Sequence, residues 1–294
     1  MGVESNFFEP IHGTFPAREA PPERLYASAG GFCELWRLSH AGRYRVCKVL
    51  KPEFRGNPLQ ESLLRKEFEL GFGLDHPGIC RILDWAVLPE LGPAIVMEWI
   101  DGRTLDVWAE QDRPGPEQIR RVFCELCDAL DYIHRRQRVH RDLKPENVMV
   151  THDGGHVKLI DFGLADADVW YLHKQAAGTR AYASPEVLAG RPADTRSDIY
   201  AVGVMLRELG GRRFGRVAGK CLQPLPERRY GTAGDLRNAL MRRPLQRWLL
   251  LLTAGLVLAV AFSLLRESSR SARHADRIFR DATELIERTL DGAR

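Results

Sequence analysis

The chain of 294 residues lacks the features that mark several large classes of protein. No segment forms a dense block of lysine and arginine, and the net charge is only +4, which argues against a nucleic-acid partner. Residues 1–24 contain four prolines and no apolar core, so we do not predict a secretory signal peptide there. We interpret this segment as a flexible N-terminal lead-in.

Cysteine is sparse, and its six positions follow no framework spacing. Cys124 and Cys127 have the two-residue gap of a zinc-ligand pair, but no second pair or histidine cluster stands at ligand spacing. We therefore predict buried, reduced thiols, which indicates a reducing cytosol.

Long apolar runs are absent except at residues 248–265, which carry no charge and lie between Arg247 and Arg266. A helix of this length spans about 27 Å, close to the hydrocarbon thickness of a bilayer. Trp248 stands where an interfacial aromatic anchor would. The run predicts one transmembrane helix; the alternative is a buried core helix, which normally carries a polar residue every few positions.

The remainder has the composition of a globular protein, since the chain is 44% apolar and 28% charged. Its most informative stretch is Val-His-Arg-Asp-Leu-Lys-Pro-Glu-Asn at residues 139–147. The triplet Asp161-Phe162-Gly163 begins fourteen residues after Asn147. Together the two motifs resemble the catalytic loop and the metal-binding motif of the eukaryotic-type (Hanks-type) Ser/Thr protein kinases.

This resemblance implies a role for each polar residue of the two motifs. Asp142 would accept or orient the hydroxyl proton of the substrate, and Lys144 would face the transferring phosphate. Asn147 and Asp161 would supply oxygen ligands to Mg²⁺. The implied cofactors are ATP and Mg²⁺. The implied fold is α+β, a two-lobed kinase-like domain over residues 25–243 with a β-rich N-lobe and a mostly helical C-lobe.

A glycine-containing segment stands where the family has the loop that covers the ATP phosphates. Ser28, Gly30 and Gly31 belong to it, and Gly30 alone matches one of the family's three glycines. Glycine there lets backbone N–H groups approach phosphate oxygens without an intervening Cβ. On its own the segment is better interpreted as a plain hairpin. The lysine that follows, Lys48, favours the ATP-binding interpretation.

Lys48 lies in an alternating apolar strand, and by resemblance it contacts the α- and β-phosphates. The family's spacing places its glutamate partner at Glu67, with Glu69 as the alternative. Gly71 follows Glu67 by one turn, where the family usually has a large apolar residue. Gly71 and Gly73 together would cost such a helix about 2 kcal/mol relative to alanine. We therefore predict a loosely held control helix, and a formed Lys48–Glu67 pair together with a fully packed Phe162 would count against it.

The segment from Ala94 to Gly102 resembles the hinge between the kinase lobes. Met97 would border the adenine pocket, and Glu98 and Ile100 would lie in the segment whose backbone bonds the adenine. An unrelated strand and turn would look much the same, so this prediction depends on its neighbours.

The segment from Leu164 to Glu186 resembles the platform for a protein substrate, with Thr179 in its closing part. Lys144 implies Ser/Thr rather than Tyr specificity. Arg141 would ordinarily receive a phosphorylated residue, but the only hydroxyl side chain between Asp161 and Gly178 is Tyr171. We therefore do not expect loop phosphorylation to activate this chain.

Two further residues resemble structural braces of the family. Asp198 would hold the backbone of the catalytic loop, and Arg229 would pair with Glu186. Only Gly215–Gly219 separates two matching stretches where the family inserts a docking helix, so we predict a shortened C-lobe.

The arginines on the two sides of residues 248–265 balance, so orientation rests on the resemblance: ATP is cytosolic, and the kinase domain must be too. This predicts a single-pass protein of the cell (inner or plasma) membrane. Residues 266–294 are polar and helix-compatible. They are interpreted either as a solvated stub or as a coiled segment that, with the transmembrane helix, pairs two chains in a homodimer.

These features together predict a membrane-tethered Ser/Thr protein kinase, similar to bacterial members of the family, which transfers the γ-phosphate of Mg-ATP to protein hydroxyls. One alternative is a pseudokinase scaffold, favoured by the altered glycine loop and Gly71. The other is a kinase for a small molecule or lipid headgroup, which the substrate platform argues against.

Overall fold

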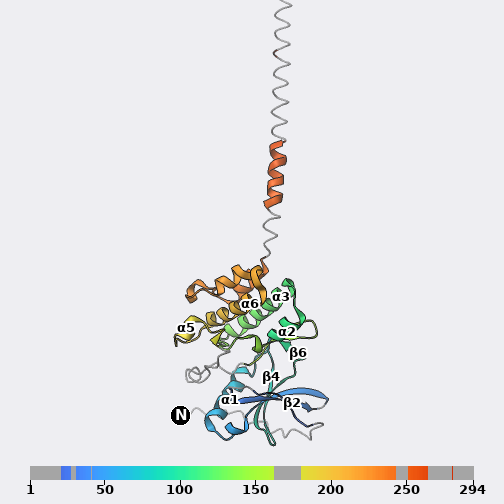
Figure 1. Ribbon diagram of the computed structural model, residues 1–294, viewed down its shortest axis with the longest axis vertical. Helices are drawn as coiled ribbons and strands as arrows, with labels where there is room; N and C mark the ends of the chain where they lie inside the picture. The colour runs from blue at the N-terminus through green and yellow to red at the C-terminus, as the bar shows by residue number, and fades with distance from the viewer. Residues whose placement is uncertain are drawn as a thin grey trace, which may run out of the picture. The chain divides into compact units, whose positions relative to one another are not determined.

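The structure, a computed structural model, describes residues 21–27, 31–40, 42–161, 180–242, 251–263 and 280. The chain divides into two units, Met1–Met241 and Arg242–Arg294. The first unit contains a sheet-rich N-lobe and a helical C-lobe, drawn in blue to teal and in green to orange (Figure 1).

The N-lobe is built on a five-stranded antiparallel sheet with the order β1-β2-β3-β5-β4. Side chains alternate between the faces of a strand, so neighbours in β3 enter different surroundings. Val49 packs in one cluster with Leu38, and Leu50 packs in another with Leu64 of the adjoining helix. Lys48, between Cys47 and Val49, thereby shares the face of Leu50. The strands are β1 Glu23–Ala27, β2 Cys33–His40, β3 Arg43–Leu50, β4 Ile82–Leu88 and β5 Gly92–Glu98.

Helix α1 (Pro58–Gly71) is the control helix of the N-lobe, and it follows a 3-10 turn at Pro52–Phe54. The side chain of Asn57 caps it by accepting the Leu59 N–H at 3.1 Å, a standard way to satisfy a free donor of the first turn. The helix ends at Gly71, and Gly73 lies beyond it with φ +84°.

The expected cost of two glycines within this helix was therefore wrong, because Gly73 is outside it. Positive φ is the conformation that glycine adopts readily, so Gly73 allows the chain to turn after the helix. Arg138, which lies after α3, donates to the carbonyl of Leu70 in the last turn of α1. A cation there also suits the negative end of the helix dipole.

The C-lobe surrounds the long helix α3, whose apolar face forms the centre of the largest hydrophobic cluster. Residues 139–147 lead into β7, the central strand of a small antiparallel sheet with the order β6-β7-β8. The strands are β6 Gly102–Thr104, β7 Val148–Thr151 and β8 Val157–Leu159. The helices are α2 Leu105–Asp112, α3 Pro116–His134, α5 Pro185–Leu188, α6 Thr195–Cys221 and α7 Ala233–Met241, with 3-10 turns at Pro145–Asn147 and Pro226–Arg228.

Helix α6 begins at the side-chain cap Asp194 and changes direction at Gly211, where φ is 56° and ψ is −151°. Its second half, residues 212–221, includes Gly215–Gly219. These glycines therefore belong to a helix and are not the short link that the sequence suggested. Helix follows helix directly at Gly211, and the 3-10 turn Pro226–Arg228 and α7 follow after Cys221.

In the second unit, residues 251–263 form a helix whose side chains are exposed, including Leu251, Leu256 and Phe262 at 64%, 67% and 67%. The predicted span 248–265 extends beyond this helix into residues outside the described ranges. Within the described residues, no helix has both the length and the apolar character needed to cross a membrane.

Candidate active site

Three charged side chains meet where the N-lobe sheet, α1 and the end of β8 converge. Lys48 Nζ lies 2.5 Å from Glu67 Oε1 and 2.8 Å from Asp161 Oδ1. Glu67 is therefore the helix partner of Lys48, as the spacing predicted. The alternative, Glu69, pairs with Arg65 at 3.2 Å and is 60% exposed. The formed pair meets one of the two conditions that count against the predicted loosely held helix; the other, the packing of Phe162, lies outside the described residues.

The electrostatics of this group are unbalanced, because one lysine faces two carboxylates. Burial lowers the pKa of Lys48, but Asp161 and Glu67 outweigh it and hold that pKa well above its ordinary value. Burial raises the pKa of Glu67 to about 7; the Asp161 carboxylate adds to the rise and Lys48 opposes it. The group thus carries surplus negative charge when all three side chains are ionised.

Asp142 and Asn147 form the second part of the site, between α3 and β7. Asn147 Nδ2 donates to the main-chain oxygen of Asp142 at 2.7 Å and to its Oδ2 at 3.1 Å. Lys144 Nζ donates to the same Oδ2 at 3.0 Å. Asp142 and Asn147 are 3% and 6% exposed, so their orientation is fixed by packing as well as by hydrogen bonds.

The backbone of the catalytic segment is held by Asp198, the first-turn aspartate of α6. Its carboxylate accepts the N–H groups of His140 at 2.9 Å and Arg141 at 3.0 Å, and it lies 2.8 Å from His134 Nε2. Burial would raise the pKa of Asp198, but the contacts with His134 and His140 hold it below its ordinary value. Arg141, with φ +67°, is thereby kept in a left-handed conformation that a non-glycine residue seldom adopts.

The hinge is fastened through the side chain of Glu98. Its Oε1 accepts the Arg81 N–H at 2.9 Å and the Lys158 ammonium at 2.7 Å, and its N–H donates to the Arg81 carbonyl at 3.0 Å. Met97 packs against the cluster beneath β3, and Ile100 is buried. Lys158 belongs to β8, so this contact links the hinge to the C-lobe.

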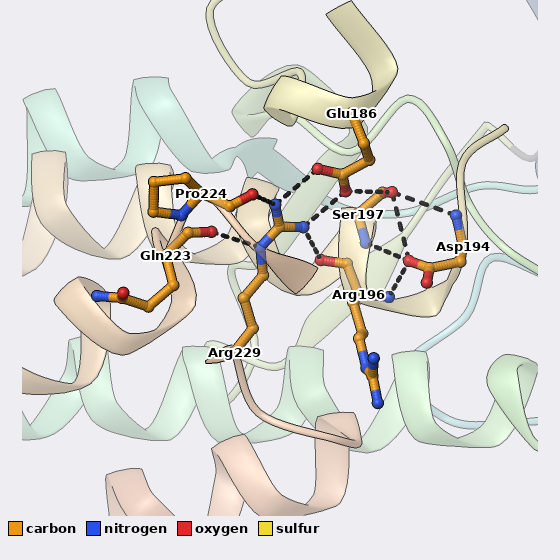
Figure 2. A network of polar contacts seen from close by, with 7 residues as sticks. All are labelled: Glu186, Asp194, Arg196, Ser197, Gln223, Pro224 and Arg229. Atoms are coloured by element: carbon orange, nitrogen blue, oxygen red, sulfur yellow. Dashed lines mark hydrogen bonds and ion pairs between the residues drawn. The ribbon is translucent and has the colours of Figure 1, made fainter. Parts of the chain in front are cut away.

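The brace predicted between Glu186 and Arg229 is present and buried (Figure 2). Arg229 makes two parallel bonds of 2.6 Å to the carboxylate, and Ser197 Oγ donates to it at 2.9 Å. Burial would raise the pKa of Glu186, but these bonds lower it to about 2. Further N–H groups of the guanidinium donate to the main-chain carbonyls of Gln223, Pro224 and Arg196.

The donor set of the site fits Mg²⁺ and a polyphosphate. The amide nitrogen of Asn147 is bonded to Asp142, which leaves its amide oxygen as a ligand, and Asp161 supplies a carboxylate. Mg²⁺ takes one or two protein oxygens and fills its shell with water and phosphate. Among the described residues no group of three or more His, Cys, Asp or Glu could hold a metal ion.

Several predicted site residues lie outside the described residues: Ser28, Gly30, Phe162, Gly163 and Thr179. Gly31 is described and partly buried at the start of β2. Two residues that contact predicted site residues were themselves not predicted: His134 and Lys158. Their partners, Asp198 and Glu98, are 64 and 60 residues away, so no local spacing could have identified them.

The sequence profile of the protein kinase domain matches residues 29–217. A probable serine/threonine-protein kinase of Corynebacterium efficiens is 35% identical over 192 residues, which cover 62% of this chain and 29% of that protein. A probable serine/threonine-protein kinase of Streptomyces coelicolor is 36% identical over 191 residues, 61% and 28% of the two chains. The aligned part is thus less than a third of each relative.

The Mycobacterium tuberculosis PknI kinase domain superposes with a TM-score of 0.56 at 23% identity, covering 74% of this chain and 92% of that one. At that identity the likeness concerns the fold alone. It confirms the predicted two-lobed arrangement of a sheet-rich N-lobe and a helical C-lobe.

Proposed function

Because the chain belongs to the protein kinase domain family, we propose that it is a Ser/Thr protein kinase that transfers the γ-phosphate of Mg-ATP to protein hydroxyls. The observation that carries the proposal is the joint presence of the Lys48–Glu67–Asp161 group and the Asp142–Asn147 pair. A scaffold without catalysis has no need for both, since their charges are costly to bury.

Each residue of the site has a task in this reaction that follows from its surroundings. Lys48, fixed by Glu67, binds phosphate oxygens as a point charge, while Asp161 and the amide oxygen of Asn147 hold the metal ion. Asp142 orients the attacking hydroxyl and takes its proton, and Lys144 beside it binds the transferring phosphate. Bound Mg-ATP supplies the phosphoryl group and a cation that offsets its charge.

Incubation of the full chain with Mg-ATP and a mixed protein substrate, followed by phosphosite mapping, tests this function. We expect phosphate on serine and threonine. Asp142→Asn should reduce the rate by about 10²- to 10⁴-fold, the range for a lost general base. The matched control is Asp153→Asn, an exposed aspartate in the β7–β8 turn, which should leave the rate unchanged. ATP binding without any phosphate transfer would instead establish the pseudokinase alternative.

We further propose that residues 248–265 tether the kinase domain to the cytosolic face of a membrane. The support is the uncharged run in the sequence and the exposed apolar side chains of residues 251–263, which need an apolar environment. A chain that is membrane-associated after extraction with alkaline carbonate supports the tether. Complete release by carbonate would refute it. Pairing of two chains through this segment or residues 266–294 is part of the same proposal and is tested by crosslinking in the membrane.

A further inference from the structure

The second half of α6 has an outward face made only of basic residues and glycine. At about 100° per residue, Arg212, Arg216 and Lys220 follow one another along one side, with Arg213 beside them. All four are exposed, whereas Phe214, Ala218 and Cys221 on the opposite side are buried. We name the four exposed cations, Arg212, Arg213, Arg216 and Lys220, the basic face.

The basic face has almost no compensating negative charge. The sequence contains no aspartate or glutamate between Glu208 and Glu227. Arg213 lies 3.8 Å from Glu117, and Lys220 lies over the ring of Tyr230. Within the described part of the chain, Arg212 and Arg216 form no ion pair. The charge therefore faces solvent.

The basic face also belongs to a wider asymmetry of charge. Residues 180–242 contain twelve lysines and arginines against six aspartates and glutamates, whereas residues 1–179 contain 22 against 27. A small overall charge thus hides a C-terminal part of the kinase domain that is distinctly positive. Such a concentration attracts an anionic partner over a Debye length of about 8 Å at physiological salt.

The surface between the cations is open. Gly215 and Gly219 lie on the same side of the helix, and an added Cβ at either would meet no atom within 4 Å. Without side chains at these positions, a headgroup can approach the backbone between the arginines.

The last helix of the kinase domain runs in the direction of the end of α3 that the basic face contacts. Helix α7 runs antiparallel to α3, since Gly234 lies beside Asp131 and Arg237 pairs with Asp128. The same register places its last residue, Met241, beside Cys124 in the middle of α3. Arg213 contacts that end through Glu117. Figure 1 shows the orange helices, which follow Gly211, at the end of the C-lobe away from the strands.

From these observations we propose that the basic face binds the anionic headgroups of the bilayer and so sets the orientation of the kinase domain. The inference rests on the proposed tether: five residues separate Arg242 from Trp248, and the six steps between them span at most about 20 Å, so the end of α7 stays near the membrane. Each basic residue close to an anionic surface strengthens binding about fivefold. The stretch at which the kinase family inserts a docking helix is thereby a lipid-facing surface in this chain.

The test uses the full chain in nanodiscs of phosphatidylcholine alone or with phosphatidylglycerol. Lys220 is acylated with an amine-reactive ester, and its rate is followed by mass spectrometry. We expect a rate at least about threefold lower in the anionic discs, with the difference lost at about 1 M salt, where the Debye length is about 3 Å. Equal rates in the two kinds of disc would overturn the proposal.

Variants separate the basic face from charge in general. The triple variant Arg212→Gln, Arg213→Gln, Arg216→Gln should abolish most of the difference in the acylation rate of Lys220 between the two kinds of disc. The matched control Arg43→Gln, Lys66→Gln, Arg135→Gln removes the same charge from exposed positions on β3, α1 and the end of α3. It should retain the difference in the acylation rate of Lys220. Protection of Lys220 by soluble polyglutamate but not by anionic discs would assign the face to an acidic protein partner and overturn lipid binding.

Failure of the tether or of catalysis can be told apart from failure of the basic face. If alkaline carbonate extracts the chain from the membrane, the chain is added instead to preformed vesicles, and the vesicles are sedimented to measure the bound fraction. The triple variant should then bind anionic vesicles about 100-fold more weakly than the parent chain, and equal binding would refute the proposal. Asp142→Asn, which removes the proposed base, should give the acylation rates of the parent.

Discussion

Glu67 and Glu186 are both buried beside one cationic side chain, yet their pKa values shift in opposite directions. Their side chains are 5% and 6% exposed. The pKa of Glu67 rises to about 7, and that of Glu186 falls to about 2. Burial raises both values, so the difference comes from what each carboxylate contacts.

Glu67 shares its lysine with a second carboxylate, whereas Glu186 has an arginine to itself. Arg229 gives Glu186 two short bonds and Ser197 a third. Lys48 divides its charge between Glu67 and Asp161. In the Glu186–Arg229 brace the charges balance within the protein. In the proposed active site they do not, and a bound cation would balance them.

The largest expected effect concerns the charge-balanced brace between Glu186 and Arg229. Arg229→Ala should lower the free energy of unfolding by about 3–5 kcal/mol, because it leaves the Glu186 carboxylate buried without its partner. Urea denaturation measures the change. The neighbouring Arg228→Ala, at an exposed position, is the matched control and should change it by less than about 0.5 kcal/mol. Similar values for the two variants would contradict the contrast.

A substitution in the proposed active site should cost much activity and little stability. Lys48→Met should reduce kcat/KM for ATP by about 10²- to 10³-fold, since a preorganised charge on the phosphates is lost. Unfolding free energy should change by less than about 1.5 kcal/mol, because Glu67 can take up a proton near pH 7. Steady-state kinetics and urea denaturation measure the two effects. A loss of stability as large as that of Arg229→Ala would remove the distinction.

The pH dependence sharpens the comparison. Ionised Glu67 holds Lys48, so kcat/KM for ATP should fall below about pH 7 and approach a tenfold loss per pH unit. Because the folded pKa of Glu67 is raised, its contribution to stability is present below its ordinary pKa of 4.5 and is lost as pH rises through about 7. Glu186, with a lowered pKa, contributes above 4.5 and loses that contribution as pH falls through about 2.

A pH–rate profile and denaturation at each pH measure these two dependences. Glu67→Gln cannot ionise at this position, so its residual activity should lack the acid limb near pH 7. An unchanged limb in that variant would assign the titration to another residue.

The smallest effect is expected at the neighbouring glutamate of α1. Glu69 forms an exposed pair with Arg65, and such pairs contribute about 0.3–0.5 kcal/mol. Glu69→Gln should therefore leave kcat/KM unchanged and lower stability by no more than that amount. Thermal unfolding and ATP kinetics measure both. A loss of activity comparable to that of Glu67→Gln would reverse the assignment of the two residues.

The contacts that sequence could predict are those carried by local spacing or motif. Glu67 lies three residues after Leu64 and four before Gly71, on the buried face of α1, while Glu69 points away. Family spacing also paired Arg229 with Glu186. By contrast, the pKa of Glu67 is raised first by burial between the lobes and then by the approach of Asp161, which is 113 residues from Lys48 in the chain. Such proximity arises from the packing of two lobes.

Backbone conformation was the other limit. Nothing in the composition of residues 71–73 distinguishes two glycines within a helix from one at its end and one beyond it, because the difference lies in the positive φ of Gly73. The same holds for residues 215–219, where glycines suggested a link and the chain instead forms a helix. Burial of Phe214 and Ala218 in the C-lobe core outweighs the low helix propensity of glycine there.

The change of direction at Gly211 has a consequence for protein engineering. The joint is a single exposed residue with open space around its Cα, and both flanking helical segments are anchored in the core. Exposed joints of this kind tolerate insertion, because added residues displace no packed side chain. A foreign helical hairpin grafted at Gly211 should therefore leave the parent fold intact and give this compact kinase domain a module of chosen specificity.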